Sequence, residues 1–209
     1  MKLAKLGLLF LVSFTLSSLI LIISIFRIAE IKYVFSQSPN PTPVSKDNIS
    51  INYSLPEGGK IEPDNLLWPL KALRDKILLV VTINPAKKAD LYLMMSDKRL
   101  VYAKSLLERR KPDLAVSVLT KGEKYLELAH AEERIARQKG MNTNSYLNRF
   151  AIAALKHREV IDDLISIAPE DAKPIMVKSQ DYSKNLYNEA RNNLLEAGLI
   201  APQNPFDSL

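Results

Sequence analysis

Leu6 to Phe26 form an uninterrupted apolar stretch of 21 residues without a single charged side chain. As an α-helix, a segment of this length extends about 30 Å, which matches the thickness of a bilayer's hydrocarbon core. Lys2 and Lys5 precede it and supply the positive flank that is typical of membrane anchors and of export signals. The stretch therefore predicts a chain that is tethered to a membrane or exported across one.

An uncleaved anchor explains this segment better than a removable signal peptide. Its apolar core exceeds the roughly 7–15 residues of an ordinary signal, and three charged residues separate it from the best cleavage candidate, residues 34–36. Cleavage there, which would release a secreted helical protein, is the alternative. The chain has no cysteine, so a lipid attached to cysteine, disulfide bonds and thiolate chemistry are excluded.

The orientation of the anchor follows from its basic flank. Positive charges before and after the apolar stretch are nearly balanced, because Arg27, Lys32 and Lys46 follow it. A short basic arm before a first helix usually stays in the cytoplasm. We therefore expect a single-pass protein of the cell membrane whose C-terminal body lies outside the cytoplasm.

Composition divides the chain into four parts. Residues 1–35 hold the predicted anchor, and residues 36–60 form a linker rich in Pro, Ser and Asn. Residues 61–198 are long enough for one domain with a hydrophobic core and are predicted to form a helical bundle. Residues 199–209, which include two prolines, are predicted to be a flexible C-terminal tail.

Every strong periodic signal in the body is helical, so the predicted fold is all-α. Apolar stripes and their breaks indicate one short helix followed by four long ones, over about 69–81, 85–110, 112–140, 145–165 and 169–198. Short turns between helices of similar length favour an antiparallel up-and-down bundle. A helical-hairpin repeat near the tetratricopeptide length is the less favoured alternative, because that family's pattern of Trp, Leu-Gly and Tyr is absent.

The first helix is expected to carry a periodic apolar stripe behind Pro69. Leu70, Leu73, Ile77 and Val81 follow each other at steps of three and four residues.

The segment Ile61 to Leu107 resembles a bacterial family known as domain of unknown function 5667. The resemblance is carried by Pro63-Asp-Asn-Leu-Leu-Trp-Pro-Leu-Lys71, by Asn84-Pro-Ala-Lys-Lys-Ala-Asp-Leu91 and by Arg99-Leu100. It implies an exported or membrane-tethered helical protein with an acidic residue in its first helix, where Asp75 stands here. It implies no established activity.

Two histidines raise the question of a metal site. Glu127 and His130 form an E-x-x-H pair, the ligand pattern of carboxylate-bridged di-iron bundles, and His157 is the only other histidine. Ala154 occupies the place where a second E-x-x-H would need its carboxylate. A solvated helix face explains the first pair better. A metal-binding bundle that uses Glu127, His130 and His157 is the alternative.

Charge and motifs argue against several other functions. The net charge of the whole chain is +6, but the residues beyond 60 hold 23 Lys/Arg against 20 Asp/Glu. These charges are too dispersed to form the basic patch of a nucleic-acid-binding surface. No nucleotide-binding, hydrolase or zinc-protease motif is present in the sequence. We expect no enzymatic activity and no cofactor.

Trp68, the single tryptophan, precedes Pro69 at the start of the first helix. It is expected to dock this helix on the bundle, and an interaction site for a partner protein at Trp68 and Pro69 is the alternative. The leading hypothesis is a membrane-anchored helical protein that acts by binding, as a scaffold, an assembly factor or a sensor of the envelope. The partner is expected to be a protein, and self-association stays open. A cytoplasmic arm of about five residues is too short to hold a transcription factor, which argues against an anti-sigma-type transducer.

Overall fold

The computed structural model describes Gly7 and residues 10–18, 34–35 and 50–208, and the chain divides into two units at residues 32 and 33. In the first unit, residues 10–18 are helical. The rest of the predicted spanning segment lies outside the described residues, except for Gly7. None of the helices in the described part of the chain combines the length and the apolar character needed to cross a membrane.

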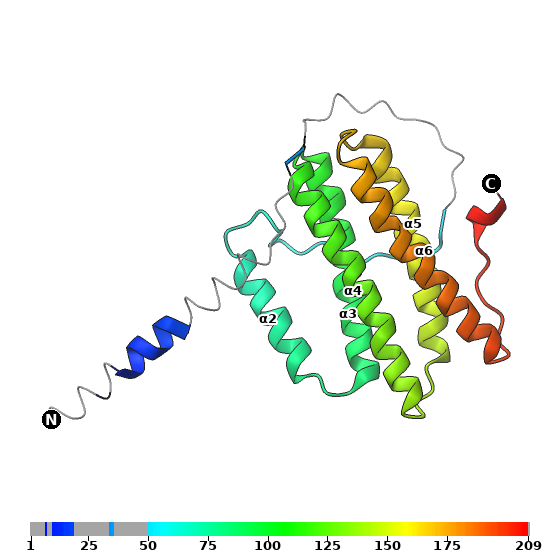
Figure 1. The fold of residues 1–209 in the computed structure, drawn as a ribbon, viewed down its shortest axis with the longest axis horizontal. Helices are drawn as coiled ribbons and strands as arrows, with labels where there is room; N and C mark the ends of the chain where they lie inside the picture. The colour runs from blue at the N-terminus through cyan, green and yellow to red at the C-terminus, as the bar shows by residue number, and fades with distance from the viewer. Residues whose placement is uncertain (1–6, 8–9, 19–33, 36–49, 209) are drawn as a thin grey trace. The chain divides into compact units, whose positions relative to one another are not determined.

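The second unit is all-α over residues 50–208, as the periodicity predicts (Figure 1). Its α-helices are α2 (Trp68–Val81), α3 (Pro85–Glu108), α4 (Pro112–Gln138), α5 (Asn144–Ile167) and α6 (Lys173–Glu196). A short 3-10 helix, η1 (Pro205–Ser208), follows them. The long helices begin and end within a few residues of the predicted limits.

Local chemistry explains these limits. Asn84 caps α3, because its side chain accepts a hydrogen bond from the amide of Lys87, and Pro85 takes the first helical position. Gly140 and Gly198 end α4 and α6 with φ of 76° and 71°, a left-handed conformation that glycine adopts without strain.

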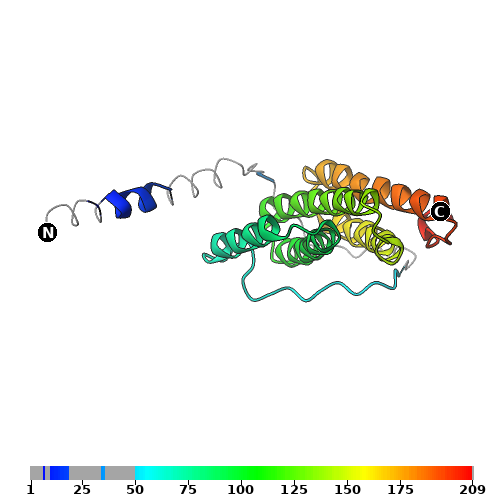
Figure 2. The same cartoon turned by 90° about the horizontal axis from the view of Figure 1, so that it is seen from below.

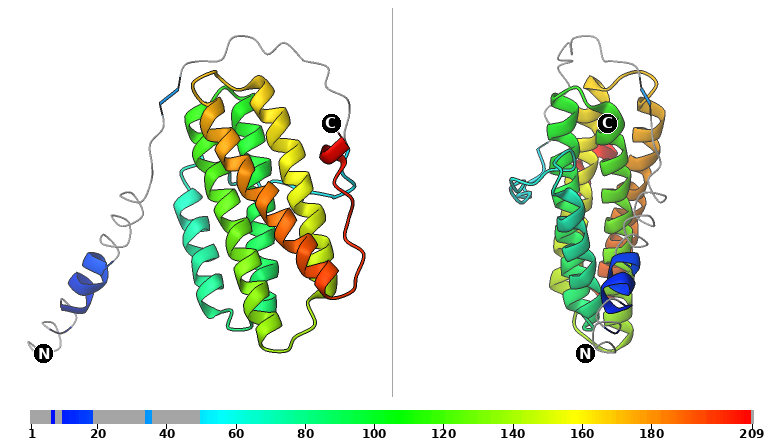
Figure 3. Two further views of the ribbon diagram at one scale, coloured as in Figure 1. Left: turned by 45° about the vertical axis from the view of Figure 1, so that its right-hand side comes forward. Right: turned by 90° about the vertical axis from the view of Figure 1, so that its left-hand side faces the viewer.

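The four long helices pack as two antiparallel hairpins, α3 with α4 and α5 with α6. The hairpins meet mainly through α4 against α6 and, more sparsely, through α3 against α5 (Figure 3). Each of these two contacts joins helices that run in the same direction, because chain direction alternates from helix to helix. Gly122 lets α3 and α4 approach closely, since a Cβ atom there would lie 3.1 Å from the Cβ of Arg99.

The hydrophobic core consists of two clusters along the bundle. The first has Leu106, Val116 and Ile161 among its fully buried members, and the second has Leu126, Phe150 and Ala154. Between them, polar and charged side chains from α3, α4 and α5 meet in the interior.

Residues 50–67, called the strap below, cross the bundle as an extended segment before α2 begins (Figure 2). The amide of Ile51 donates to Glu159 of α5 at 2.7 Å, and the Tyr53 hydroxyl donates to Asp97 of α3 at 2.7 Å. The strap therefore covers the sparse contact between these two helices. The first half of the strap belongs to the predicted linker 36–60, whose residues 36–49 lie outside the described part.

The residues that follow α6, expected to form a flexible tail, fold back onto the bundle. The Tyr187 hydroxyl donates to the carbonyl of Pro202 at 2.7 Å, and Phe206 packs against the second core cluster. The guanidinium of Arg158 lies 4.1 Å from the centre of the Phe206 ring. Apolar and cation–π contacts thus hold the described part of this tail.

The stripe predicted for the first helix does not face the core. Leu70, Ile77 and Val81 are exposed on α2 and Leu73 is only partly buried, whereas Leu79 is the helix's single buried residue. α2 is apolar on both sides, and its sparse contact with α3 leaves the regular stripe outside.

Candidate functional site

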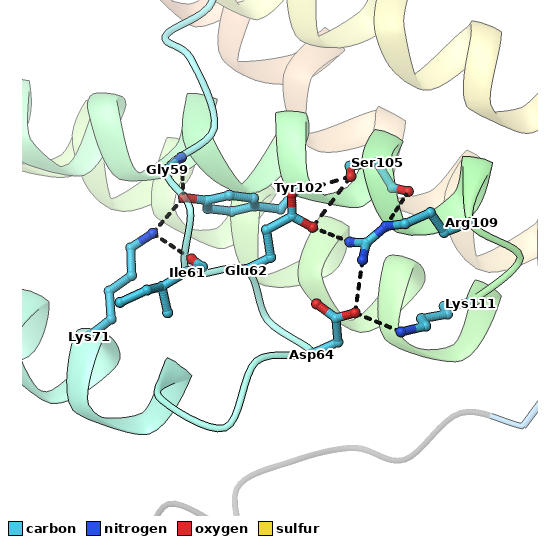
Figure 4. Close-up of polar contacts among 9 residues, drawn as sticks. All are labelled: Gly59, Ile61, Glu62, Asp64, Lys71, Tyr102, Ser105, Arg109 and Lys111. Atoms are coloured by element: carbon cyan, nitrogen blue, oxygen red, sulfur yellow. Dashed lines mark hydrogen bonds and ion pairs between the residues drawn. The ribbon is translucent and has the colours of Figure 1, made fainter.

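The strap and α2 are joined to the bundle through Tyr102, a buried residue of α3 (Figure 4). Its hydroxyl oxygen accepts hydrogen bonds from the amide of Gly59 at 2.9 Å and from the Lys71 ammonium at 2.5 Å. Lys71 also donates to the carbonyl of Ile61 at 2.9 Å. One phenol oxygen thus holds both the strap and the first turn of α2 in place.

Trp68 completes this junction from the start of α2. Its ring meets the ring of Tyr102 edge to face, with the centres 5.6 Å apart. The Lys71 ammonium lies 5.1 Å from the Trp68 ring centre and 4.6 Å from that of Tyr102, within cation–π range of both. Trp68 is half-buried against the first core cluster and Pro69 is exposed. The arrangement accounts for Trp68 as the anchor that docks α2.

Two basic residues after α3 clamp the acidic end of the strap. Arg109 pairs with Glu62 and, at 2.9 Å, with Asp64. Lys111 pairs with Asp64 at 2.6 Å. The hydrogen bond from Lys111 lowers the pKa of Asp64, with the charges of Arg109 and Lys111 acting in the same direction. These groups are partly exposed, so the clamp positions the strap more than it stabilises the fold.

Asp75 lies on the side of α2 that faces the bundle, where its side chain is 14% exposed. Its charge acts on Arg99, a buried residue of α3 that stacks 4.0 Å from the centre of the Tyr125 ring. Burial lowers the pKa of Arg99, and the nearby Asp75 carboxylate opposes that shift. Asp75 also pairs with the exposed Arg74 at 2.6 Å, so the only acidic residue of α2 acts on one exposed and one buried arginine.

The opposite side of α2 carries a group of exposed apolar side chains with Arg74 among them, called the outer face below. It consists of Leu70, Ile77, Leu78, Val80 and Val81, whose exposed fractions run from 42% to 82%. Leu66 and Leu67 before the helix and Ile83 after it extend the same exposure along the chain. Single exposed apolar residues are ordinary, but a contiguous group of this kind marks an interaction surface.

A separate polar cluster lies inside the bundle at His157 of α5, which is fully buried. Its Nδ1 lies 2.7 Å from Glu123 of α4, and its Nε2 lies 3.0 Å from Asp97 of α3. The other oxygen of Asp97 accepts the hydroxyl of Tyr53. The His157 imidazole thus links three helices, and the strap joins the cluster through Asp97.

Electrostatics keep this imidazole charged. Burial lowers the pKa of His157, but the charges and hydrogen bonds of Glu123 and Asp97 outweigh burial and raise the pKa to about 9. For Tyr53, burial and the Asp97 carboxylate raise the pKa well above its usual value, so its hydroxyl stays a donor. The arrangement is that of a buried ion cluster that fixes helix register.

The other histidine, His130 of α4, belongs to a different cluster. It stacks on Phe150 with ring centres 5.3 Å apart, and its Nε2 lies 3.2 Å from the Glu189 carboxylate. The neighbouring Glu133 is buried and accepts the Thr143 hydroxyl at 2.6 Å. Burial lowers the pKa of His130, which favours the neutral ring at neutral pH.

The three candidate metal ligands are thus not brought together. Glu127 is exposed, His130 stacks on Phe150, and His157 pairs with Glu123. Glu123, the partner of His157, is seven residues from His130 on α4, which corresponds to a rise of about 10 Å between the two histidine clusters. Over the described residues, no group of three or more His, Asp or Glu has an arrangement that could hold a metal ion.

Comparison with known families matches residues 60–171 to a family described as a domain of unknown function, DUF5667. This range covers more than half of the chain. The chain belongs to the DUF5667 family. The matched region exceeds the resembling segment Ile61–Leu107 and includes α4 and α5. Neither the curated proteins nor the solved structures contain a match to this chain.

The structure shows what the DUF5667 motif residues do in this chain. Asp64, Trp68 and Lys71 form the junction with α3, and Asp75 lies on the same side as Arg99. Asn84 and Pro85 begin α3. The motif therefore attaches α2 to the bundle. In this attachment, the outer face of α2 is exposed.

Sequence reasoning missed Tyr102, Asp97 and Glu123. Tyr102 lies among the apolar positions of its helix, where its sequence position alone does not distinguish a hydrogen-bonding phenol from a packing residue. Asp97 and Glu123 each stand among the apolar positions of their helices, between Leu93 and Leu100 or beside Leu126. A carboxylate inside an apolar stripe is the signal that could have indicated a buried polar cluster.

Proposed function

We propose that this member of the DUF5667 family is a single-pass membrane protein whose helical body lies outside the cytoplasm and acts by binding. The outer face of α2 is its contact surface. The body serves as a scaffold, an assembly factor or a sensor of the envelope, and has no catalytic role.

The exposed apolar surface of α2 is the observation that carries this proposal. The bundle core is complete without these side chains, since both core clusters form from α3 to α6, with α2 contributing only Trp68 at the edge. The family motif attaches α2 at its first turn while leaving its regular apolar stripe outside, and a partner for that stripe would explain this arrangement.

The membrane location rests on the sequence. The 21 uncharged residues from Leu6 to Phe26 have the length of a spanning helix, and the basic arm before them favours a cytoplasmic N-terminus. Reporter fusions at the C-terminus test this arrangement. An export-dependent reporter should be active and a cytoplasm-dependent reporter silent, and the reverse pattern would contradict the proposed topology.

Photo-crosslinking in cells tests the contact surface. A photoreactive residue at Leu70 or Ile77 should give adducts at native expression, whereas one at Val177, an exposed apolar residue of α6, should give few. Equal yields at the two places would remove the outer face as the contact surface. The adducts also report whether the partner is a protein, a lipid or a second copy of the chain.

A further inference from the structure

We infer that the outer face of α2 docks on an anionic lipid surface, so that the body lies against the membrane that anchors it. This inference rests on the proposed function and names the partner of the same surface. It follows from the apolar side chains of the outer face, from the distribution of charge along the body and from the length of the tether.

The apolar part of the surface fits the interfacial zone of a bilayer. Leu70, Ile77 and Val81 follow one line along α2, with the exposed Arg74 between Leu70 and Ile77. Leu78 and Val80 flank that line. A helix with such a stripe lies in the plane of the membrane surface, with the stripe about 5–10 Å into the boundary between headgroups and acyl chains.

Charge distinguishes α2 from the rest of the body. Residues 66–88 carry five Lys/Arg and one Asp, whereas the remainder of residues 61–209 carries 18 Lys/Arg and 19 Asp/Glu. The basic excess of the body is therefore concentrated at α2 and the start of α3. The single acid is Asp75, which pairs with the exposed Arg74 at 2.6 Å, and Lys88 pairs with Glu132 of α4 at 2.8 Å.

This charge favours lipid over a second copy of the chain. An apolar stripe bordered by cations complements anionic headgroups, and each basic residue near such a surface adds to the attraction. Pairing two outer faces would bring two basic segments together and would be opposed by their repulsion.

The tether between the apolar stretch and the body is short. The backbone amide of Phe35 donates to Asp113 at the start of α4, at 2.6 Å. Eight residues separate Phe35 from Phe26, the end of the apolar stretch, and they span at most about 30 Å. A body held at this distance meets the headgroups at a high effective concentration.

Because the chain has no cysteine, single-cysteine variants of the full-length protein carry one probe each. The full chain is reconstituted into vesicles of phosphatidylcholine alone or with 30% phosphatidylglycerol, and a fluorophore at position 77 (Ile77→Cys) is exposed to lipids that carry a quencher. Val177→Cys is the matched control on α6, and Leu16→Cys reports the anchor.

In anionic vesicles, the probe at position 77 should be quenched strongly and the probe at position 177 weakly. In neutral vesicles, quenching at position 77 should fall. Replacing Arg74 and Lys76 together with Gln should lower the ratio of docked to undocked protein in anionic vesicles by roughly fivefold per cation. High salt should have a similar effect.

The outcomes separate this inference from the proposed function. If position 16 is quenched and position 77 stays in water in anionic vesicles, lipid docking is overturned while the anchor stands. If position 77 is protected and forms disulfides between copies, a second copy covers the outer face and lipid docking is again overturned. If position 77 is quenched and position 16 is not, the docking holds and the anchored topology fails.

Discussion

At the scale of single residues, the polar interior depends on one cation. His157 stands between Glu123 and Asp97, and the described residues offer no other cation in hydrogen-bond contact with these two carboxylates. Removing one partner of such a buried group leaves charge without compensation, which destabilises proteins far more than the intact cluster stabilises them.

Replacing His157 with Gln should therefore destabilise the fold by about 3–5 kcal/mol. Thermal and urea unfolding of the full chain in detergent, followed by circular dichroism, measures this change. Glu127→Gln is the control, because Glu127 is exposed on α4 and its replacement should shift stability by less than about 0.5 kcal/mol. A loss at His157 no larger than at Glu127 would show that the buried cluster does not hold the helices.

The same residue predicts how stability depends on pH. The pKa of His157 is raised from 6.5 to about 9 in the fold, so its contribution is complete below pH 6.5 and is lost as pH rises through 9. Unfolding between pH 6.5 and 9.5 should show a decline on the order of 3 kcal/mol. His157→Gln should remove this decline. A wild-type stability that is flat over this interval would exclude a charged His157.

At the scale of elements, the strap and α2 form a unit that is attached to the bundle at few points. Tyr102 takes hydrogen bonds from Gly59 and Lys71, and Trp68 packs on the Tyr102 ring. The contact of α2 with α3 is otherwise sparse. A segment held in this way opens more easily than the core it covers.

Trp68→Ala should release α2 while leaving the bundle folded. Hydrogen exchange should show lost protection over residues 68–81, with α3 to α6 unchanged, because Trp68 is the α2 residue that packs against the first core cluster. Leu70→Ala is the matched control, since Leu70 is exposed on the same helix. Cooperative loss of protection in all helices would mean that α2 is part of the core.

The sequence predicts some features of the helices and not others. Apolar period, proline positions and terminal glycines predict the long helices because these signals act within a few residues along the chain. The orientation of α2 was not predictable, because Leu70 and Leu79 are equally apolar and only the packing against Tyr102 and Arg99 decides which side is buried. The strap escaped prediction for a similar reason, since Gly59 and Ile61 bind through their backbones.

At the scale of the whole molecule, the two histidines lie in separate clusters of the bundle. His157 is enclosed by carboxylates of α3 and α4, and His130 stacks against α5 beside Glu189 of α6. His157 is paired with two carboxylates, whereas both ring nitrogens of His130 lack a hydrogen-bond partner among the described residues. Over the part of the chain that the structure describes, no group of three or more His, Asp or Glu is placed to hold a metal ion.

Removing metal should therefore leave the protein unchanged. Treatment of the full chain with a chelator should shift its melting temperature by less than about 1 °C, and elemental analysis should find no stoichiometric metal. His130→Ala is the control for specific binding. Stoichiometric zinc or iron that disappears in this variant, together with a lower melting temperature after chelation, would support the metal-binding bundle.

The strap also decides how the molecule responds to a mechanical load. A pull on the N-terminal segment reaches the contact of Phe35 with Asp113 first and then the hydrogen bonds of Ile51 and Tyr53, before any long helix bears tension. Stretching a single molecule from that side should show small low-force steps ahead of the rupture of the bundle, and one abrupt rupture would contradict this order. A body built in this way unfolds in steps when its N-terminal segment is pulled. Its long helices stay folded until the strap has detached.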